Sequence, residues 1–542
     1  MFITILLLIA YILWGIIFYK IFKCFWSLYS APKPKAKTPT AETPSQATKL
    51  GDFETNTEVE SSYKAIDENR DEPGGLDEPE CQTERQKMAM GTEDMLQDVI
   101  KNGEKIQDQV EAELETVPAT VNPNKALEDQ YYDHPLSCYY IKSSHNTYLL
   151  GNQIIGNSTI EAYRHAISNK VRCLELDLHD GYNGPVVYHN WTLTSKINAV
   201  EVFKDIAANY QKDDLPLILD IEDHLSDFQR NYIKDEMLEI FQDVLYLQDR
   251  TELECLPSPN QLRGKIIFIV AKSKWGSFAN ICQKVVYKDE ETFRNRKFYE
   301  VTSLSEHKFN GIMKSSLKTK IIDRFWGSSE NARLDQFRET TTKRLIRIYP
   351  GANRQLSGNF NPVLALNAGC QLVALNVQTK DSHLAIYESL FRENGNTGFT
   401  LKPNICLNKG ATTNKKKISI KVIKGSNLTT NKKLVYTYVS IRIEGVQDDR
   451  KINKTKSAKS GDGHNPKWNE DLKFDITSPE LGYLLLQVKQ KQYLGLHHYT
   501  IGMYAVPLTN IVEGVQTIPL QDQFLRNINA NLLVEIHTED LT

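Results

Sequence analysis

Residues from about 126 to 403 alternate short apolar runs with helical patterns, and this alternation sharply limits the folds open to the chain. Strand-like runs occur at 173–178, 217–221, 265–271 and 370–377. Helix-like segments lie between them, for example at 159–168 and 228–244. Strands that alternate with helices predict βα units around a parallel sheet. That sheet is either a closed barrel or an open doubly wound sheet.

From about residue 415 the helical patterns stop. Short strand-like runs follow one another at 417–422, 436–443, 471–476, 483–489 and 532–537. Closely spaced strands without helices predict an all-β sandwich. The chain therefore has an α/β part followed by an all-β part, and no internal repeat is visible.

The first residues form a nearly continuous apolar stretch over 2–19. A membrane-spanning helix needs about 20 such residues. No charged residue precedes the stretch, whereas Lys20, Lys23 and Lys33 follow it. Because positive flanks stay in the cytosol, we expect residues 1–30 to be a single-pass transmembrane anchor with the catalytic body facing the cytosol. The alternative is a cleaved signal peptide, although its basic first region is absent.

Residues 31–121 form a low-complexity, partly acidic linker with few large apolar residues. Such a stretch buries too little surface to offset the entropy cost of ordering it. One short helix is expected at 92–114, where apolar residues recur at helical spacing. No EF-hand calcium loop is recognisable in this stretch.

The composition excludes some classes of protein. The 542 residues carry a formal net charge of -3, so nothing favours nucleic acid as a partner. The 8 cysteines are scattered without zinc spacing, which favours reduced thiols, although a disulfide between some pair stays open.

Two carboxylates stand two residues apart in the run at 173–178. Glu175 and Asp177 share one face of the predicted strand, and Leu174, Leu176 and Leu178 share the other. Carboxylates that close repel each other, so a cation or a proton is expected between them. The alternative is an exposed polar strand face.

Polar clusters follow three separate strand-like runs. They lie at 143–148, 187–190 and 222–224, and each contains a histidine. A lone histidine is more often structural than catalytic. Three such clusters at strand ends instead indicate a site at one end of a parallel sheet.

The sequences of these runs and their order along the chain resemble those of eukaryotic phosphoinositide-specific phospholipase C. HPLSCYYIKSSHNTYLLGNQ, RCLELDLHDG, VVYHNWTLTSKI and LPLILDIEDH resemble its X half, and RLIRIYPGANRQLSGNFNP and LNAGCQLVALNVQT its Y half. The resemblance implies a (β/α)8-type TIM barrel split into X and Y halves and followed by a C2 sandwich. It divides the chain into an X half at 122–274, a linker at 275–296, a Y half at 297–403 and a C2 domain at 404–542.

The resemblance also implies a site and a reaction. The implied ligands of one catalytic Ca2+ are Asn146, Glu175, Asp177 and Glu222. The implied catalytic residues are His145, His189 and a carboxylate base, Glu175 or Glu222. In the implied reaction the inositol 2-hydroxyl attacks the lipid phosphate and releases diacylglycerol, after which water opens the cyclic phosphate.

The headgroup pocket departs from the family pattern. Ser303, Arg347 and Tyr349 match its substrate-binding residues. Ile269 and Ala271, however, stand where the family has two phosphate-holding lysines, and Lys272 and Lys274 replace them only if the register slips. We therefore expect weak discrimination between phosphatidylinositol and its 4,5-bisphosphate.

Two surfaces outside the pocket also differ. The apolar rim is represented by Ile154 and Leu193, with Asn353 where tryptophan is common. The C2 stretches 425–434 and 490–499 contain no carboxylate, so we expect this domain to bind no calcium.

We therefore expect a calcium-dependent phospholipase C that acts on phosphoinositide lipids at a membrane in lipid signalling. The alternative is a catalytically silent scaffold that binds phosphoinositides or partners. No catalytic residue is lost, which favours the enzyme. The sequence leaves open which membrane it occupies, its preferred lipid, its protein regulators and its oligomeric state.

Overall fold

A computed structural model describes residues 129–314, 329–392, 394–428, 435–460, 464–492 and 497–541. The expected anchor at 1–30, the linker at 31–121 and the helix at 92–114 lie outside these residues and stay predictions. Within the described ranges, no helix combines the length and apolar character needed to cross a bilayer.

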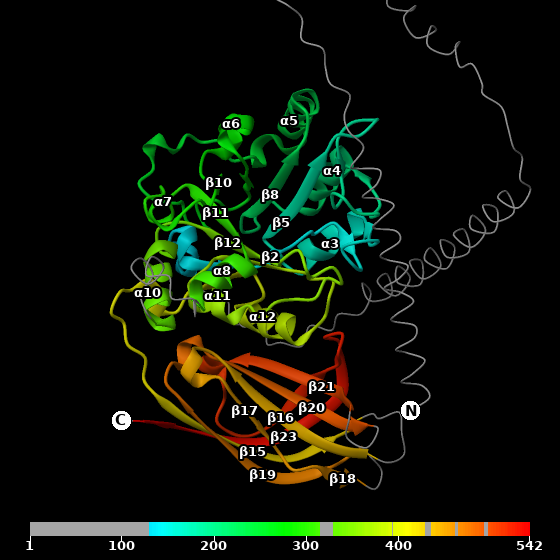
Figure 1. Cartoon of the computed structure of the whole chain (residues 1–542), viewed down its shortest axis with the longest axis vertical. Coiled ribbons are helices and arrows are strands. Elements are labelled where there is room, and N and C mark those ends of the chain that lie inside the picture. The colour runs from blue at the N-terminus through cyan, green and yellow to red at the C-terminus, as the bar shows by residue number, and fades with distance from the viewer. Residues whose placement is uncertain are drawn as a thin grey trace, which may run out of the picture. The chain divides into compact units, whose positions relative to one another are not determined.

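Eight parallel strands close into a barrel (Figure 1). Each neighbouring pair is parallel; an isolated bridge between Val270 and Gln283 joins β9 to β10, and pairing of β13 with β2 closes the ring. This closure confirms the barrel and excludes the open sheet. The strands are β2 (Ser143–Ser144), β5 (Cys173–His179), β8 (Leu217–His224), β9 (Ile266–Ile269), β10 (Gln283–Val286), β11 (Glu300–Ser305), β12 (Ile346–Tyr349) and β13 (Leu372–Leu375).

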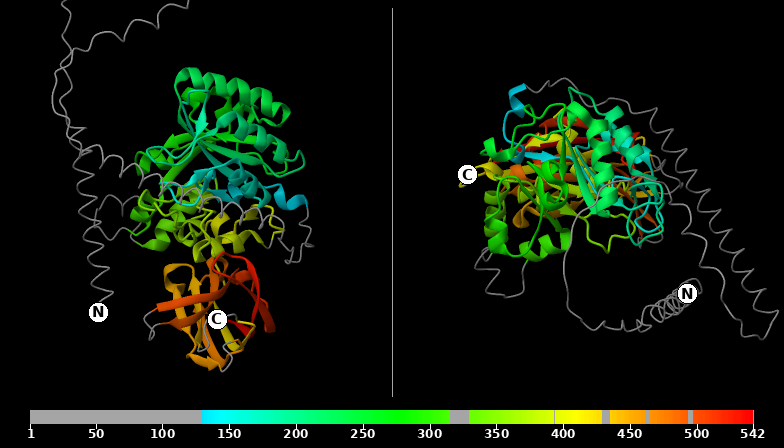
Figure 2. Two further views of the ribbon diagram at one scale, coloured as in Figure 1. Left: turned by 90° about the vertical axis from the view of Figure 1, so that its right-hand side faces the viewer. Right: turned by 90° about the horizontal axis from the view of Figure 1, so that it is seen from above.

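Helices flank the outer side of the strands (Figure 2). The predicted helices at 159–168 and 228–244 are confirmed as α3 (Ile160–Ser168) and α5 (Asp227–Phe241). Thr159 and Ser226 cap them by accepting hydrogen bonds from backbone N–H groups of the first turn. The others are α4 (Ala199–Asn209), α6 (Lys272–Trp275), α7 (Glu290–Arg294), α8 (Glu306–Met313), α10 (Glu330–Thr341), α11 (Val363–Asn367), α12 (Ser382–Arg392) and α13 (Asn404–Leu407).

The segment expected to link the two halves, 275–296, supplies part of the barrel instead. It contains β10, which pairs in parallel with β11, and the short helix α7. The sequence pattern did not predict this strand, because β10 reads QKVV, with Lys284 as its second residue and Val286 76% exposed. A four-residue strand with a charged residue and an exposed valine lacks a clear alternation.

The barrel interior changes character along the strands. Cys173, Ile218 and Ile267 belong to an apolar cluster near the amino ends of β5, β8 and β9. Further along β5 and β8, the inward positions are carboxylates. The outward residues of β5, Leu174, Leu176 and Leu178, pack into the cluster that also contains residues of α3, α4 and α5. The charged positions therefore lie toward the carboxyl ends of the strands, where barrel enzymes place their sites.

The C-terminal part is a β-sandwich, as predicted. The strand order is β17-β16-β20-β21-β22-β23-β15-β19, and a single residue pair, Met503 with Gln521, joins β21 to β22. That weak join divides the order into two four-stranded layers, and β18 pairs with β16. The strands are β15 (Lys416–Ser426), β16 (Val435–Glu444), β17 (Lys451–Lys454), β18 (Ala458–Ser460), β19 (Lys467–Ile476), β20 (Tyr483–Gln492), β21 (His497–Pro507), β22 (Gly514–Gln521) and β23 (Asn527–Asp540).

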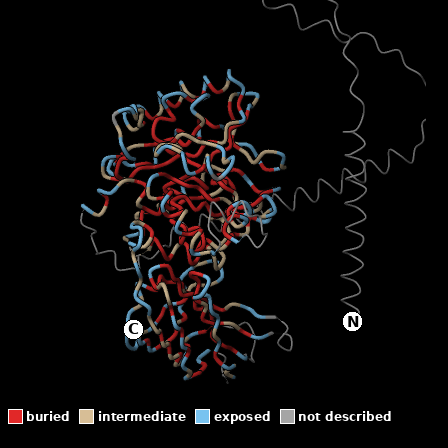
Figure 3. The backbone as a smooth tube through the Cα atoms, turned by 60° about the vertical axis from the view of Figure 1, so that its left-hand side comes forward, coloured by how far each residue is buried: buried red, intermediate tan, exposed pale blue. Residues whose placement is uncertain are grey.

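The sandwich shares a core with the barrel. Helix α12 contacts β20 and β21, and Tyr483, Leu485 and Met503 lie in the same apolar cluster as Leu384 of α12. Figure 3 shows buried segments in both parts of the chain. Because this interface is apolar, the C-terminal domain is best studied within the whole chain.

Candidate active site

Strands β5 and β8 bring four carboxylates together at the mouth of the barrel. In the register of this pair, Glu175 is opposite Asp220, and Asp177 is opposite Glu222. Glu175 and Asp177 are only 2% and 5% exposed. This burial confirms that the two share an inward face and excludes the exposed strand face. We call Glu175, Asp177, Asp220 and Glu222 the carboxylate cluster.

Arg347 enters the carboxylate cluster from β12. Its Nη2 lies 2.6 Å from Oε1 of Glu175, and its Nε lies 2.8 Å from Oδ2 of Asp220. The guanidinium side chain is 1% exposed. The sequence predicted Arg347 as a substrate-binding residue, but here its charge is already shared between two carboxylates.

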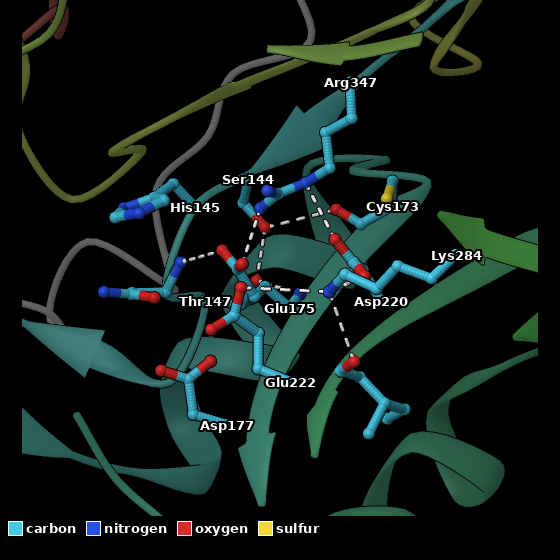
Figure 4. A network of polar contacts seen from close by, with 12 residues as sticks. Ser144, His145, Thr147, Cys173, Glu175, Asp177, Asp220, Glu222, Lys284 and Arg347 are labelled. Carbon is cyan, nitrogen blue, oxygen red and sulfur yellow. Dashed lines mark hydrogen bonds and ion pairs between the residues drawn. The ribbon is translucent and has the colours of Figure 1, made fainter. Parts of the chain in front are cut away.

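A second cation, Lys284, enters from β10 (Figure 4). Its Nζ lies 2.9 Å from Oδ1 of Asp220 and 3.8 Å from Oε1 of Glu222. Sequence analysis assigned no role to Asp220 or Lys284. The signal for Asp220 was available, because Asp220 and Glu222 repeat the i, i+2 spacing of Glu175 and Asp177. Lys284 gave no signal, because its strand was not recognised.

The crowded carboxylates have divergent proton affinities. Burial, opposed by Arg347 and reinforced by the neighbouring carboxylates, raises the pKa of Glu175 to about 7. Burial and the charge of Glu222 raise the pKa of Asp177 well above its ordinary value. Contact with His224 and the nearby Lys284 ammonium lower the pKa of Glu222. Glu222 is therefore ionised at neutral pH, while Asp177 binds a proton more readily than an exposed aspartate does.

Oxygen atoms suited to a metal ion lie on one side of this mouth. Oδ1 of Asp177 is buried and has no hydrogen-bond partner among the described residues, while Oδ2 accepts a 2.7 Å hydrogen bond from Tyr148. Asn146 has a left-handed backbone, with φ 43°, and its Nδ2 donates to Gln153 at 2.7 Å. That bond leaves the Asn146 amide oxygen available, so the predicted ligand set offers only oxygen donors, as calcium requires.

These ligands do not yet form a finished metal site. Within the described ranges, no three acidic or histidine side chains converge closely enough to hold a metal ion. Glu175 accounts for part of this, because its carboxylate contacts Arg347 and accepts a 2.8 Å hydrogen bond from the backbone N–H of Asn146. The donor chemistry of the predicted ligands nevertheless fits calcium.

Gln153 contacts one predicted catalytic histidine, His189, directly and the partner of the other, His145. The Nδ1 of His189 lies 2.7 Å from the Gln153 carbonyl oxygen. The Nδ1 of His145 lies 3.0 Å from Oδ1 of Asn376, which also accepts a 3.2 Å hydrogen bond from the Gln153 side chain. Each ring therefore donates through Nδ1 and keeps Nε2 free for a substrate. Gln153 lies in the HNTYLLGNQ run, yet sequence analysis gave neither it nor Asn376 a role.

The predicted headgroup residues surround Arg347. The ring of Tyr349 lies 5.2 Å from the Arg347 guanidinium carbon, and it is parallel to the His145 ring at a centroid distance of 6.5 Å. The Ser303 hydroxyl is buried and has no hydrogen-bond partner in the described part of the chain. Burial and the charge of Arg347 lower the pKa of His145 to about 3, so this imidazole is neutral in the lipid-free protein.

The register of β9 does not slip. Ile269 is the last residue of β9 and is fully buried, and α6 begins at Lys272. Lys272 donates to Asn280 at 3.2 Å, and Lys274 lies 3.4 Å from Asp223. Both lysines therefore have partners on the helix side and do not replace the missing phosphate-holding lysines.

The rim of the mouth exposes apolar side chains. Leu193 is 82% exposed and Ile154 is 39% exposed, as expected for the predicted rim residues. Trp191, at 90%, and Leu356, at 81%, extend this apolar surface. Asn353 instead contacts His307, with 2.7 Å between Oδ1 and Nε2.

Comparison with known proteins places this site in a family. Residues 132–272 match the phosphatidylinositol-specific phospholipase C X domain, residues 276–405 its Y domain and residues 416–521 the C2 domain. The 1-phosphatidylinositol 4,5-bisphosphate phosphodiesterase zeta-1 of Sus scrofa is 32% identical, covering 71% of this chain and 72% of that protein. The chain belongs to the phosphatidylinositol-specific phospholipase C family.

Other relatives agree with this assignment. The delta-3-A phosphodiesterase of Danio rerio is 29% identical over 74% of this chain, but the match spans only 57% of that protein. The crystal structure of S. officinalis PLC21 superposes with a TM-score of 0.66 at 27% identity, covering 76% of this chain and 56% of that one. The X, Y and C2 arrangement predicted from the sequence is confirmed.

Proposed function

We propose that this protein is a calcium-dependent phospholipase C that cleaves phosphoinositide lipids into diacylglycerol and inositol phosphates. One observation carries the proposal: the open Oδ1 of Asp177 lies in a cluster of oxygen donors at the same mouth as two histidines with free Nε2 atoms. The relatives bear the name 1-phosphatidylinositol 4,5-bisphosphate phosphodiesterase, which supports the same reaction class.

The proposed calcium ligands are Asn146, Glu175, Asp177 and Glu222. A bound calcium ion supplies charge that lowers the pKa of the inositol 2-hydroxyl and neutralises the lipid phosphate. Glu222 is the better candidate for the base, because it is ionised at neutral pH and partly exposed at the mouth. Glu175 is the weaker candidate for the base, because it contacts Arg347 and burial raises its pKa to about 7.

The histidines handle the phosphate and the leaving group. The Gln153 carbonyl fixes the ring of His189, so a protonated Nε2 can deliver a proton to the diacylglycerol oxygen. His145 approaches the phosphate from the other side of the mouth. A bound anionic phosphate raises the pKa of this ring from its low value and so allows Nε2 to donate a hydrogen bond.

The proposed substrate is a phosphoinositide with little dependence on its ring phosphates. The cations nearest the pocket, Arg347 and Lys284, already contact carboxylates, and Lys272 and Lys274 of α6 have partners in Asn280 and Asp223. We therefore expect similar rates of hydrolysis for phosphatidylinositol and for its 4,5-bisphosphate.

A membrane is the proposed place of action. The apolar rim suits contact with lipid. The apolar stretch at 2–19 with lysines only after it supports a single-pass anchor with the catalytic body in the cytosol. An anchored chain should stay in the membrane pellet after alkaline carbonate treatment, and release into the supernatant would contradict the anchor.

Release of inositol phosphates from labelled vesicles, with calcium and with chelator, tests the activity. We expect release only with calcium, and loss of release in the His189→Ala variant. The alternative is a silent scaffold, which would bind phosphoinositide vesicles and release nothing under either condition.

A further inference from the structure

The carboxylate cluster contains more negative charge than one calcium ion neutralises. Its four side chains carry four negative charges when ionised, and Arg347 and Lys284 supply two positive ones. The remaining charge of minus two matches one divalent cation. The positive charge of Lys284 is therefore needed for the net charge of the cluster with one bound calcium ion to be zero.

Lys284 lies between two levels of the cluster. Its Nζ is 2.9 Å from Asp220, which is fully buried, and 3.8 Å from Glu222, whose side chain is 40% exposed at the mouth. Arg347 holds the deeper level, because it contacts Glu175 and Asp220. Of Arg347 and Lys284, the ammonium of Lys284 is the one that approaches Glu222 (Figure 4), where Nε2 of His224 also lies 3.9 Å from the carboxylate.

This position has two opposed consequences. The ammonium attracts Glu222 and offsets its repulsion from Asp177, so the carboxylate is held in place before any metal binds. The same ammonium repels a calcium ion that binds Glu222, because like charges a few ångströms apart interact strongly in a partly buried site. Removing the lysine should loosen Glu222 and strengthen the attraction for calcium.

We propose that Lys284 is a positioning residue that holds Glu222 for the reaction and raises the calcium concentration that the site requires. The inference rests on the proposed calcium-dependent function. It assigns to Asp220 the opposite effect, because Asp220 neutralises the lysine without reaching the mouth.

The test is calorimetric titration of the full chain in detergent micelles with calcium. The part of the calcium-binding heat that is absent in the Glu175→Ala variant is assigned to the proposed calcium site of the barrel. On electrostatic grounds we expect Lys284→Met to bind calcium about tenfold more tightly and Asp220→Asn about tenfold more weakly. The double variant should fall within about threefold of the parent, because its two charge changes leave the net charge of the cluster unchanged.

Measurement of phosphoinositide hydrolysis provides a second test on the same variants. In Lys284→Met we expect kcat to fall while the calcium concentration for half-maximal activity also falls. Lys284→Arg, which keeps the charge, should restore the parent calcium affinity. Lys308→Met is the matched control. Lys308 is on α8, and its contacts among the described residues are with the ring and the backbone carbonyl of Tyr287, not with the carboxylate cluster.

A purely structural lysine predicts a different outcome. Loss of packing weakens calcium binding and turnover together, so unchanged or weaker binding in Lys284→Met overturns the inference. If that variant does not fold, Asp220→Asn and the double variant differ only at Lys284, and equal affinities overturn it. If the parent chain shows no calcium-binding heat that depends on Glu175, the proposed calcium dependence is refuted instead.

Discussion

The hydroxyl of Tyr148 lies 2.7 Å from Oδ2 of Asp177 and leaves Oδ1 of that carboxylate open. This hydrogen bond orients a proposed calcium ligand from the β2–β3 segment, since β3 is Leu149–Leu150. Partners behind a metal ligand typically contribute 10- to 100-fold in metal affinity.

Tyr148→Phe should therefore weaken calcium binding by about tenfold or more, because Asp177 loses the donor that fixes its orientation. Tyr163→Phe is the matched control, since Tyr163 is equally buried but donates to the Glu175 backbone carbonyl at 3.0 Å. Calorimetry of both variants checks the prediction. Equal affinities in the two would mean that the Tyr148 hydroxyl does not orient the ligand.

Removal of the proposed general acid should stop turnover without unfolding the chain. We expect His189→Ala to lower kcat by roughly 10²- to 10⁴-fold, the usual range for general acid–base catalysis. The melting temperature should change little, because the ring is only partly buried and makes one hydrogen bond to Gln153. His537→Ala, on β23 of the sandwich, is the control. Turnover equal to the parent would remove His189 from the mechanism.

Calcium binding should weaken as the pH falls through neutrality. Burial raises the pKa of Glu175 to about 7 in the metal-free protein, and calcium binds the ionised form. Above pH 7 the ligand is already charged, whereas each unit below pH 7 costs up to about tenfold in apparent affinity for one displaced proton. Calorimetry at pH 6, 7 and 8 measures the shift, and buffers of different ionisation enthalpy count the protons. A constant affinity across this range would contradict the raised pKa.

A lysine restored beside the pocket should change substrate preference. Ala271→Lys places a cation at the start of α6, where the family pattern has one. A charge-assisted contact contributes about 1.5–3 kcal/mol, so the bisphosphate should gain roughly tenfold or more over phosphatidylinositol. Ser273→Lys, an exposed site on the same helix, controls for added surface charge. Hydrolysis of mixed vesicles measures the ratio, and a strong bisphosphate preference in the parent would indicate another cation.

The sequence predicted the strands whose alternation is complete. The run at 173–178 became β5 because Leu174, Leu176 and Leu178 all meet helices while Glu175 and Asp177 face inward. Strand β10 was missed because its charged inward residue, Lys284, gains its partner from another strand. β17 was missed for a related reason, since its sequence KINK is exposed at the sheet edge.

The site was predictable only where single residues carry the chemistry. His145, His189 and the proposed ligands stand in recognisable runs. The Asp220–Lys284 and Gln153–Asn376 contacts join segments 64 and 223 residues apart, and closure of the barrel brings them together. No local pattern encodes such pairs. The ion pairs of Arg347 were not predictable for the same reason, because both its carboxylate partners come from other strands.

The last prediction concerns calcium in the C2 domain. Asp449 is fully buried and accepts hydrogen bonds from the backbone N–H of Thr477 at 2.7 Å, from its hydroxyl at 2.8 Å and from the backbone N–H of Ser478 at 2.9 Å. Its carboxylate is therefore committed to joining two loops, and Asp462 lies outside the described residues. Of Asp448 and Asp449, the two aspartates of this region that the structure describes, Asp448 lacks such a role.

Calcium needs about six to eight oxygen ligands, and among the described residues of this region Asp448 alone supplies too few. Titration of the full chain should give one calcium per molecule, and Glu175→Ala should abolish it. Asp449→Asn should lower the melting temperature without changing this stoichiometry, because three donors lose a charged acceptor, each such bond contributing about 1.5–3 kcal/mol. Asp448→Asn is the control and should change neither quantity. A second bound calcium that survives in Glu175→Ala and disappears in Asp448→Asn would instead place a metal site in the C2 domain.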